Sequence, residues 1–209
     1  MLYPISTAIA KKGVDGGLAA AEGVIQKMFG PAAEEIGLMF RDKARVYRLK
    51  NLLSVVTKTD ELLRANSANL HTVPLRTLLP IIEGASLEDD DALSKKWAGL
   101  LASAAVSLEP WAAHPSFPRI LSEITAHEAV MLDRLSELGG RTEWKPFRQR
   151  LAADFGCPEE MIRPAHGNLF RLGLWANTVG QNPLAADVVL SEFGRAFLAA
   201  THGLPKRGA

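Results

Sequence analysis

The chain has 209 residues, enough for one large domain or two small ones around a sizeable hydrophobic core. Apolar residues make up 47% and charged residues 22% of the sequence, which excludes a disordered chain, and the net charge of +1 offers no overall attraction for nucleic acid or anionic lipid. Cys157 is the single cysteine, so no intrachain disulfide can form. The longest uncharged apolar stretch, residues 97–108, is too short for a membrane-spanning helix, which needs about 20 residues. We therefore expect a cytoplasmic protein.

The first third of the chain predicts two helices. Residues 14–29 are rich in Ala and Gly, and Gly30-Pro31 combines a helix C-cap with a first helical residue. From Pro31 to about Ala65, apolar residues recur at spacings of three and four, which predicts one long helix. The predicted stripe consists of Ile36, Met39, Val46, Leu49, Leu53, Val56 and Leu63. A helix of this length must pack along other helices or along a second copy of itself.

The other face of this long helix is basic. Residues 41–64 carry seven basic and three acidic side chains. A solvated helix face explains such a pattern, and a docking surface for an acidic partner is the alternative. The candidate partner surface consists of Arg41, Arg45, Arg48 and Lys50.

The middle of the chain predicts two further helices. Pro74 suits the start of one, which Pro80 either kinks or restarts. Ser86 is the expected N-cap of the next helix, and the acidic residues 88–91 lie at the positive end of its dipole. These consecutive carboxylates splay apart on one turn, so we expect no metal site. The expected buried stripe is Leu93, Trp97, Leu100, Leu101 and Ala104, with Lys95 and Lys96 on the exposed side.

The last part of the chain predicts three helices followed by two strands and a final helix. A capping box, Thr125 to Glu128, opens the first helix, which is expected to bury Met131, Leu132, Leu135 and Leu138. The next two helices end at Gly156 and at about Leu172. Residues 174–175 and 188–190 are the strand candidates, and residues 191–200 form the last helix. Three helices and then a β-hairpin is an order typical of a winged helix.

We therefore predict a mainly α fold. A long helical hairpin or bundle is followed by a C-terminal winged-helix-like unit with a small β-hairpin. The predicted units are an N-terminal helix rich in Gly and Ala (1–30), a helical bundle (31–118) and the winged-helix-like domain (119–209).

Several short motifs follow one another along the chain. They read GPAAEEIG at 30–37, DKARVYRLKN at 42–51, LPIIE at 79–83, ASLE at 85–88, WAGLL at 97–101 and HPSF at 114–117. Residues 169–174 and 190–198 continue the series. Together they resemble the Abi-alpha (abortive infection alpha) family over about residues 25–200. The resemblance implies an α-helical bacterial protein associated with defence against bacteriophage, and it carries over no catalytic residues.

The sequence contains no familiar catalytic motif. None of its five histidines belongs to a metal-binding pair such as HExxH, and there is no GxSxG, no phosphate-binding glycine loop and no CxxC. Cys157 lies beside Pro158 at a helix entry, where a structural role is the ordinary interpretation. We therefore expect a protein that is not an enzyme and that uses no cofactor and no metal.

Nucleic-acid binding is an open alternative. Residues 119–209 carry eleven basic and ten acidic side chains, so attraction to phosphate depends on local clusters. Glu159 and Glu160 at the start of the expected recognition helix would oppose it. The candidate contacts are Arg141, Lys145, Arg148, Arg150, Arg163 and Arg171.

Three functional hypotheses follow. The leading one is a non-enzymatic, bacterial phage-defence (abortive infection) protein that acts through a protein partner or as a homo-oligomer, by the helices of residues 14–65. The alternative is a winged-helix regulator that binds nucleic acid. The third places residues 1–30 on a membrane during infection, although the cations of this segment, Lys11, Lys12 and Lys27, are few.

Overall fold

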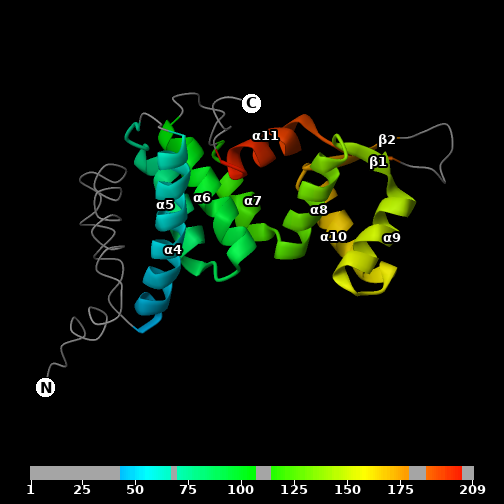
Figure 1. The fold of residues 1–209 in the computed structure, drawn as a ribbon, viewed down its shortest axis with the longest axis horizontal. Coiled ribbons are helices and arrows are strands. Elements are labelled where there is room, and N and C mark those ends of the chain that lie inside the picture. The colour runs from blue at the N-terminus through cyan, green and yellow to red at the C-terminus, as the bar shows by residue number, and fades with distance from the viewer. Residues whose placement is uncertain (1–42, 67–69, 107–113, 179–186, 204–209) are drawn as a thin grey trace, which may run out of the picture.

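The computed structural model describes residues 43–66, 70–106, 114–178 and 187–203, with side chains from residue 47 onward (Figure 1). The helix predicted for residues 14–29 and the first part of the long helix lie outside the described residues. Within them the chain is mainly α-helical, with a small three-stranded antiparallel sheet near the C-terminus. The predicted fold class is therefore confirmed.

The long helix α4 (Lys43–Ala65) ends where the sequence predicts. Its buried face consists of Asn51, Leu52, Val55, Val56, Thr59 and Leu63. The predicted stripe is wrong at Leu49, whose side chain is 41% exposed, because the neighbours of α4 cover an adjoining face. Thr59 occupies a core position because its hydroxyl donates a hydrogen bond to the carbonyl oxygen of Val55 in the preceding turn (2.8 Å).

Helices α5 (Leu75–Leu87), α6 (Asp91–Val106) and α7 (Phe117–Glu123) pack with α4 around a shared core (Figure 1). α5 continues through Pro80 without a break. The buried stripe predicted for α6 is confirmed at all five positions. The expected N-cap is wrong. Ser86 lies in the last turn of α5, and it is Asp90 that caps α6, because its carboxylate accepts hydrogen bonds from the backbone amides of Ala92 and Leu93 (2.9 and 3.0 Å).

Helix α8 (Ala126–Glu137) begins with the predicted capping box, in which Thr125 and Glu128 each bond the other's backbone amide. The prediction that Leu138 is buried is wrong: the helix ends before it and its side chain is 43% exposed. α9 (Trp144–Phe155) ends at Gly156, whose φ of 62° is left-handed, as expected for a glycine cap. A short 3-10 helix η1 (Glu159–Met161) leads into α10 (Ile162–Arg171).

The sheet has strand order β1-β3-β2, with both pairs antiparallel. β2 (Trp175–Thr178) and β3 (Asp187–Leu190) form the predicted hairpin. β1 (Arg141–Glu143) was not predicted, because three polar residues carry no strand signal and are held by their pairing with β3. The chain then runs through α11 (Glu192–Thr201) back onto α6 (Figure 1).

The packing of α11 on α6 needs a glycine. A Cβ atom on Gly99 would lie 2.1 Å from the carbonyl oxygen of Thr201, so only glycine permits this approach. Close by, Ser103 donates its hydroxyl to the carbonyl oxygen of Ala200 (2.9 Å). The end of α11 is thus fixed against the middle of α6, and this contact positions the site described next.

Candidate functional site

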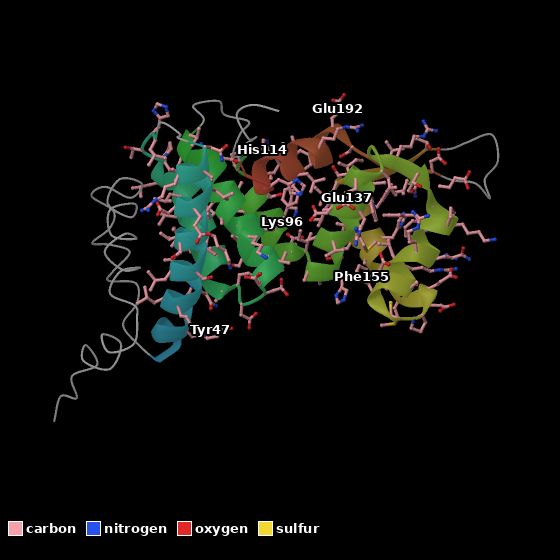
Figure 2. The ribbon with its side chains drawn as sticks, viewed as in Figure 1. Tyr47, Lys96, His114, Glu137, Phe155 and Glu192 are labelled. Carbon is pink, nitrogen blue, oxygen red and sulfur yellow. The ribbon has the colours of Figure 1, made fainter. Side chains whose placement is uncertain are left out.

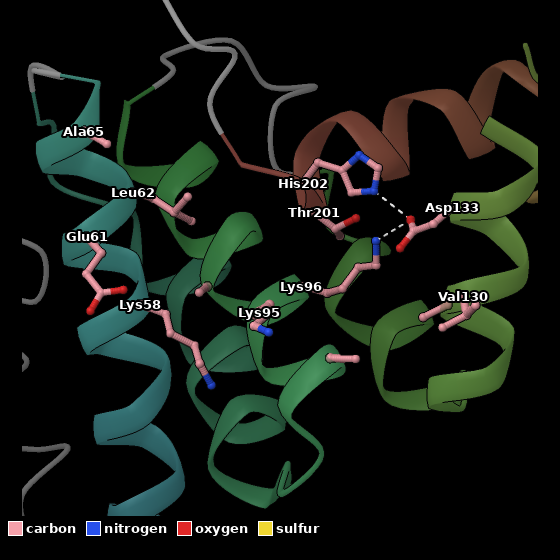
Figure 3. Close-up of a pocket in the computed structure, with 13 residues that line it drawn as sticks. Lys58, Glu61, Leu62, Ala65, Lys95, Lys96, Val130, Asp133, Thr201 and His202 are labelled. Atoms are coloured by element: carbon pink, nitrogen blue, oxygen red, sulfur yellow. Dashed lines mark hydrogen bonds and ion pairs between the residues drawn. The ribbon is translucent and has the colours of Figure 1, made fainter. Parts of the chain in front are cut away.

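Three ionisable side chains from three helices meet beside Lys96, which lies near the middle of the molecule in Figure 2; Figure 3 shows all three. Asp133 on α8 accepts hydrogen bonds at one oxygen, Oδ1, from Lys96 on α6 and from His202 at the end of α11. The Lys96 Nζ to Oδ1 distance is 2.6 Å, and the His202 Nε2 to Oδ1 distance is also 2.6 Å. We call these residues the Lys96 triad.

The helices and their packing explain the position of each residue of the triad. Lys96 follows Leu93 by three residues and precedes Leu100 by four, so helical periodicity places it beside the buried stripe of α6. Asp133 lies on α8, which packs on α6. His202 is the C-cap of α11, and the close approach at Gly99 brings it within reach.

The expectation that Lys96 is exposed is wrong, since only 8% of its side chain reaches solvent. Burial lowers the pKa of Lys96, and the nearby carboxylate of Asp133 opposes this change by stabilising the ammonium ion. Burial alone would raise the pKa of Asp133. The hydrogen bond from His202 and the charge of Lys96 outweigh it, so the pKa of Asp133 lies below its ordinary value. The triad is therefore a carboxylate held between two donors.

The Lys96 triad borders a cavity of about 610 Å³. α4 and α8 stand on either side of α6, and the hollow lies between them (Figure 3). Its apolar wall consists of Leu62, Ala65, Ala92, Ala98, Ala129 and Val130. Lys58, Glu61, Lys95 and the triad supply the charged groups. An apolar hollow of this size with a few polar groups is suited to binding a small molecule.

The predicted partner surface on α4 is only partly described. Arg41 lies outside the described residues, as does the side chain of Arg45. Arg48 is half-buried and donates to the hydroxyl of Ser86 (3.0 Å), whereas Lys50 is exposed. Further along α4, Lys58 pairs with Asp91 (2.9 Å) and Arg64 pairs with Asp60 (2.8 Å). Much of the described basic face therefore makes contacts within the chain.

Three of the six candidate nucleic-acid contacts also form ion pairs within the chain. Arg141 pairs with Asp187 (2.6 Å) across β1 and β3, and Arg148 pairs with Glu159 (2.7 Å) between α9 and η1. Arg171 pairs with Glu123 (2.8 Å) and contacts Asn168. Each of these ion pairs joins two elements of the fold, so each of the three guanidinium groups already has an acidic partner within the chain.

The other three, Lys145 and Arg150 on α9 and Arg163 on α10, are exposed and form no ion pair with any described residue. The structure thus separates the predicted set into three arginines that are paired within the chain and three open cations.

The four acidic side chains of residues 88–91 form hydrogen bonds or ion pairs with other groups of the chain. Glu88 accepts from the backbone amide of Asp90, Asp89 accepts from the hydroxyl of Tyr47 (2.6 Å), and Asp90 caps α6. The ion pairs of Asp91 with Lys95 (2.7 Å) and Lys58 lower the pKa of Asp91 to about 2. No group of three or more His, Cys, Asp or Glu in the described part of the chain is placed to hold a metal ion.

Reasoning from the sequence missed the Lys96 triad. The one available signal was the spacing of Lys96 from Leu93 and Leu100, which puts a lysine at the edge of a buried stripe. Asp133 and His202 are separated from Lys96 and from each other along the chain, by 37 residues between Lys96 and Asp133 and by 69 between Asp133 and His202. No local pattern could have brought them together.

Fold and site define a mainly α-helical protein in which helix α11 packs back on α6 and its end lines part of a cavity. The sequence profile of the family described as abortive infection alpha matches residues 44–201, well over half of the chain. The chain belongs to the abortive infection alpha family. No curated protein and no solved structure shows a significant match to the chain. Among the described helices, none is both long enough and apolar enough to span a membrane.

Proposed function

We propose that the protein acts in abortive infection, the response named by its family, by non-covalent self-association through the exposed face of α5. Family membership supports the setting in phage defence. The observation that carries the mode of action is the side of α5 that faces away from the core. On this account the protein is a binding protein with no catalytic step.

The exposed side of α5 has the pattern of a contact surface. The opposite side buries Leu78, Ile81, Ile82 and Ala85 in the core. Arg76, Leu79, Pro80, Glu83 and Leu87 are exposed, and their spacings of three and four place them along one side of the helix. Leu79 is 37% exposed and Leu87 63% exposed. Apolar residues aligned in this way are suited to packing on another helix.

The charges on this face favour a second copy as the occupant. Arg76 and Glu83 form no ion pair with any described residue. They lie at equal distances from the Leu79-Pro80 bond, so an antiparallel pair of α5 helices related by a two-fold axis would place Arg76 of each copy opposite Glu83 of the other. A face that is complementary to itself in this way is what a two-fold dimer requires.

A charge-exchange series tests the dimer. Light scattering on the full chain should give twice the chain mass of 22.6 kDa. Each single variant, Arg76→Glu or Glu83→Arg, should lower the measured mass toward that of the monomer. The double variant, Arg76→Glu with Glu83→Arg, restores opposite charges across the two-fold axis and should recover the dimer. A monomeric wild-type chain, or single variants that stay dimeric, would contradict the proposal and leave a different protein partner as the occupant.

A second candidate function is nucleic-acid binding by the C-terminal elements. Its support is the order α8, β1, α9, α10, β2, β3, which is that of a winged helix, together with the open cations Lys145, Arg150 and Arg163. Fluorescence anisotropy with mixed-sequence duplex DNA at two salt concentrations tests it. The affinity for DNA falls as salt rises. Replacing all three cations with Ala should make the plot of log affinity against log salt less steep by up to about 2.7, or roughly 0.9 for each phosphate contact that is lost.

Arg64→Ala is the matched control, because it removes an exposed cation of α4 that is remote from α9 and α10. DNA binding that weakens with salt and is lost in the triple variant but kept in the control would promote this candidate. Absence of binding at low salt would remove it.

A further inference from the structure

The cavity beside Lys96 combines an apolar wall with a buried cation. Its volume of about 610 Å³ lies within the usual range of small-molecule sites, roughly 300–1,000 Å³. We propose that this cavity binds a small ligand with an apolar body and one anionic group, a carboxylate or a phosphate, which contacts Lys96. The proposal does not depend on dimer formation through α5, which lines no part of the cavity.

The wall explains the apolar body. Four of its six apolar side chains are alanines, which leave open the volume that leucine or phenylalanine would fill. Ala98 and Ala129 are buried at the base, whereas Ala65 and Ala92 are exposed at the rim. Transfer of an apolar group from water to such a surface is favourable in proportion to the area that it buries.

The buried cation explains the anionic group. An ammonium ion has three donors, and within the described residues Lys96 has one acceptor, the carboxylate of Asp133. That acceptor is shared, because Oδ1 of Asp133 also receives the hydrogen bond from His202. Lys96 therefore keeps donor capacity in a place where burial disfavours its charge, and an anion in the cavity would offset that cost.

The other charged side chains of the cavity, outside the triad, are less enclosed than Lys96. Lys58 and Lys95 both pair with the exposed carboxylate of Asp91, and the side chain of Lys95 is 67% exposed. Glu61 is exposed on α4. With 8% of its side chain exposed, Lys96 is thus the most enclosed of the three lysines that line the cavity, and it selects the inner group of the ligand.

A pair of fluorescent probes tests the chemistry directly. Titration of the full chain with 1-anilinonaphthalene-8-sulfonate, which is apolar and anionic, should show saturable binding with one site per chain. Uncharged N-phenyl-1-naphthylamine, of similar shape, should bind about tenfold more weakly. Lys96→Met keeps the aliphatic stem and should weaken binding of the anionic probe about tenfold, the scale of a hydrogen bond between charged groups, with little effect on the neutral probe.

A second set of variants tests the location. Val130→Trp and Ala65→Trp each place an indole in the cavity, from a half-buried and an exposed lining position respectively, and each should block both probes. Ala153→Trp on α9 adds the same side chain at an exposed position that lines none of the cavity, and it should leave both affinities unchanged. Circular dichroism checks that each variant is folded.

Two results would overturn the proposal. One is equal affinity for the two probes, or an anionic-probe affinity that Lys96→Met leaves unchanged. The other is probe binding that survives both Val130→Trp and Ala65→Trp.

Discussion

Gly99 of α6 and Thr201 of α11 approach so closely that a single methyl group would separate their helices. A Cβ at position 99 would lie 2.1 Å from the carbonyl oxygen of Thr201, well inside van der Waals contact. This relationship holds the C-terminal helix on the centre of the helical bundle. It also brings His202 to Asp133, so the fold and the Lys96 triad depend on the same contact.

The first prediction concerns this contact. Gly99→Ala should lower the free energy of unfolding by about 1–3 kcal/mol, because backbone atoms must move to admit the methyl group. Gly167→Ala in α10 is the matched control, since a Cβ there meets nothing within 4 Å. It should raise stability by about 0.5–1 kcal/mol through helix propensity. Urea unfolding of both variants measures the difference, and equal effects would contradict the close approach.

The second prediction concerns the Lys96 triad. Asp133→Asn leaves a buried ammonium without its counterion and should lower the free energy of unfolding by about 2–3 kcal/mol. Lys96→Met removes the buried charge itself, keeps the aliphatic packing, and leaves Asp133 with His202. It should therefore lower the free energy of unfolding by less than Asp133→Asn does. Chemical denaturation at pH 7 ranks the two. A Lys96→Met variant less stable than Asp133→Asn would show that the carboxylate, not the ammonium, is the group that burial penalises.

The third prediction concerns pH. The pKa of Asp133 in the folded chain lies below its ordinary value of 3.8, so the stability that it contributes is fully present above about pH 4 and is lost as the pH falls through the lower folded value. Protonated aspartic acid resembles asparagine. The difference in unfolding free energy between wild type and Asp133→Asn should therefore shrink between pH 7 and pH 2.5. A difference that stays constant over this interval would refute the assignment.

The fourth prediction concerns the start of α6. Asp90→Ala removes the acceptor for two backbone amides and should lower the free energy of unfolding by about 1 kcal/mol, the usual value of an N-cap. The neighbouring Asp89→Ala, which loses only a hydrogen bond from an exposed Tyr47, should have a smaller effect. Thermal unfolding followed by circular dichroism compares the two variants. The reverse order would mean that the cap lies elsewhere.

Local signals in the sequence were enough to predict much of the fold. The capping box at Thr125, the glycine stop at Gly156 and the apolar stripe of α6 each act within one or two helical turns, and all three are confirmed. The predictions that were wrong depend on contacts with other elements. Leu49 is exposed because of how the neighbours of α4 pack, and β1 exists only because β3 pairs with it.

The candidate site was less predictable, because its residues meet only in three dimensions. The lysine at position 96 looked like an ordinary surface cation next to Lys95, and nothing in the sequence links it to Asp133 or His202. The arginines chosen for nucleic-acid binding had the right chemistry. Half of them proved to be in ion pairs whose acidic partners, among them Asp187 and Glu123, lie in other elements.

The most direct test of the central claim is the number of plaques that a phage forms on bacteria expressing the protein. The phage is one against which the wild-type chain protects. Leu79→Glu places a charge in the middle of the exposed face of α5 and should abolish protection, while the protein remains folded and present at its normal level. Leu138→Ser, which changes a leucine of similar exposure at the end of α8, should protect as well as wild type. Full protection by Leu79→Glu would contradict action through this face.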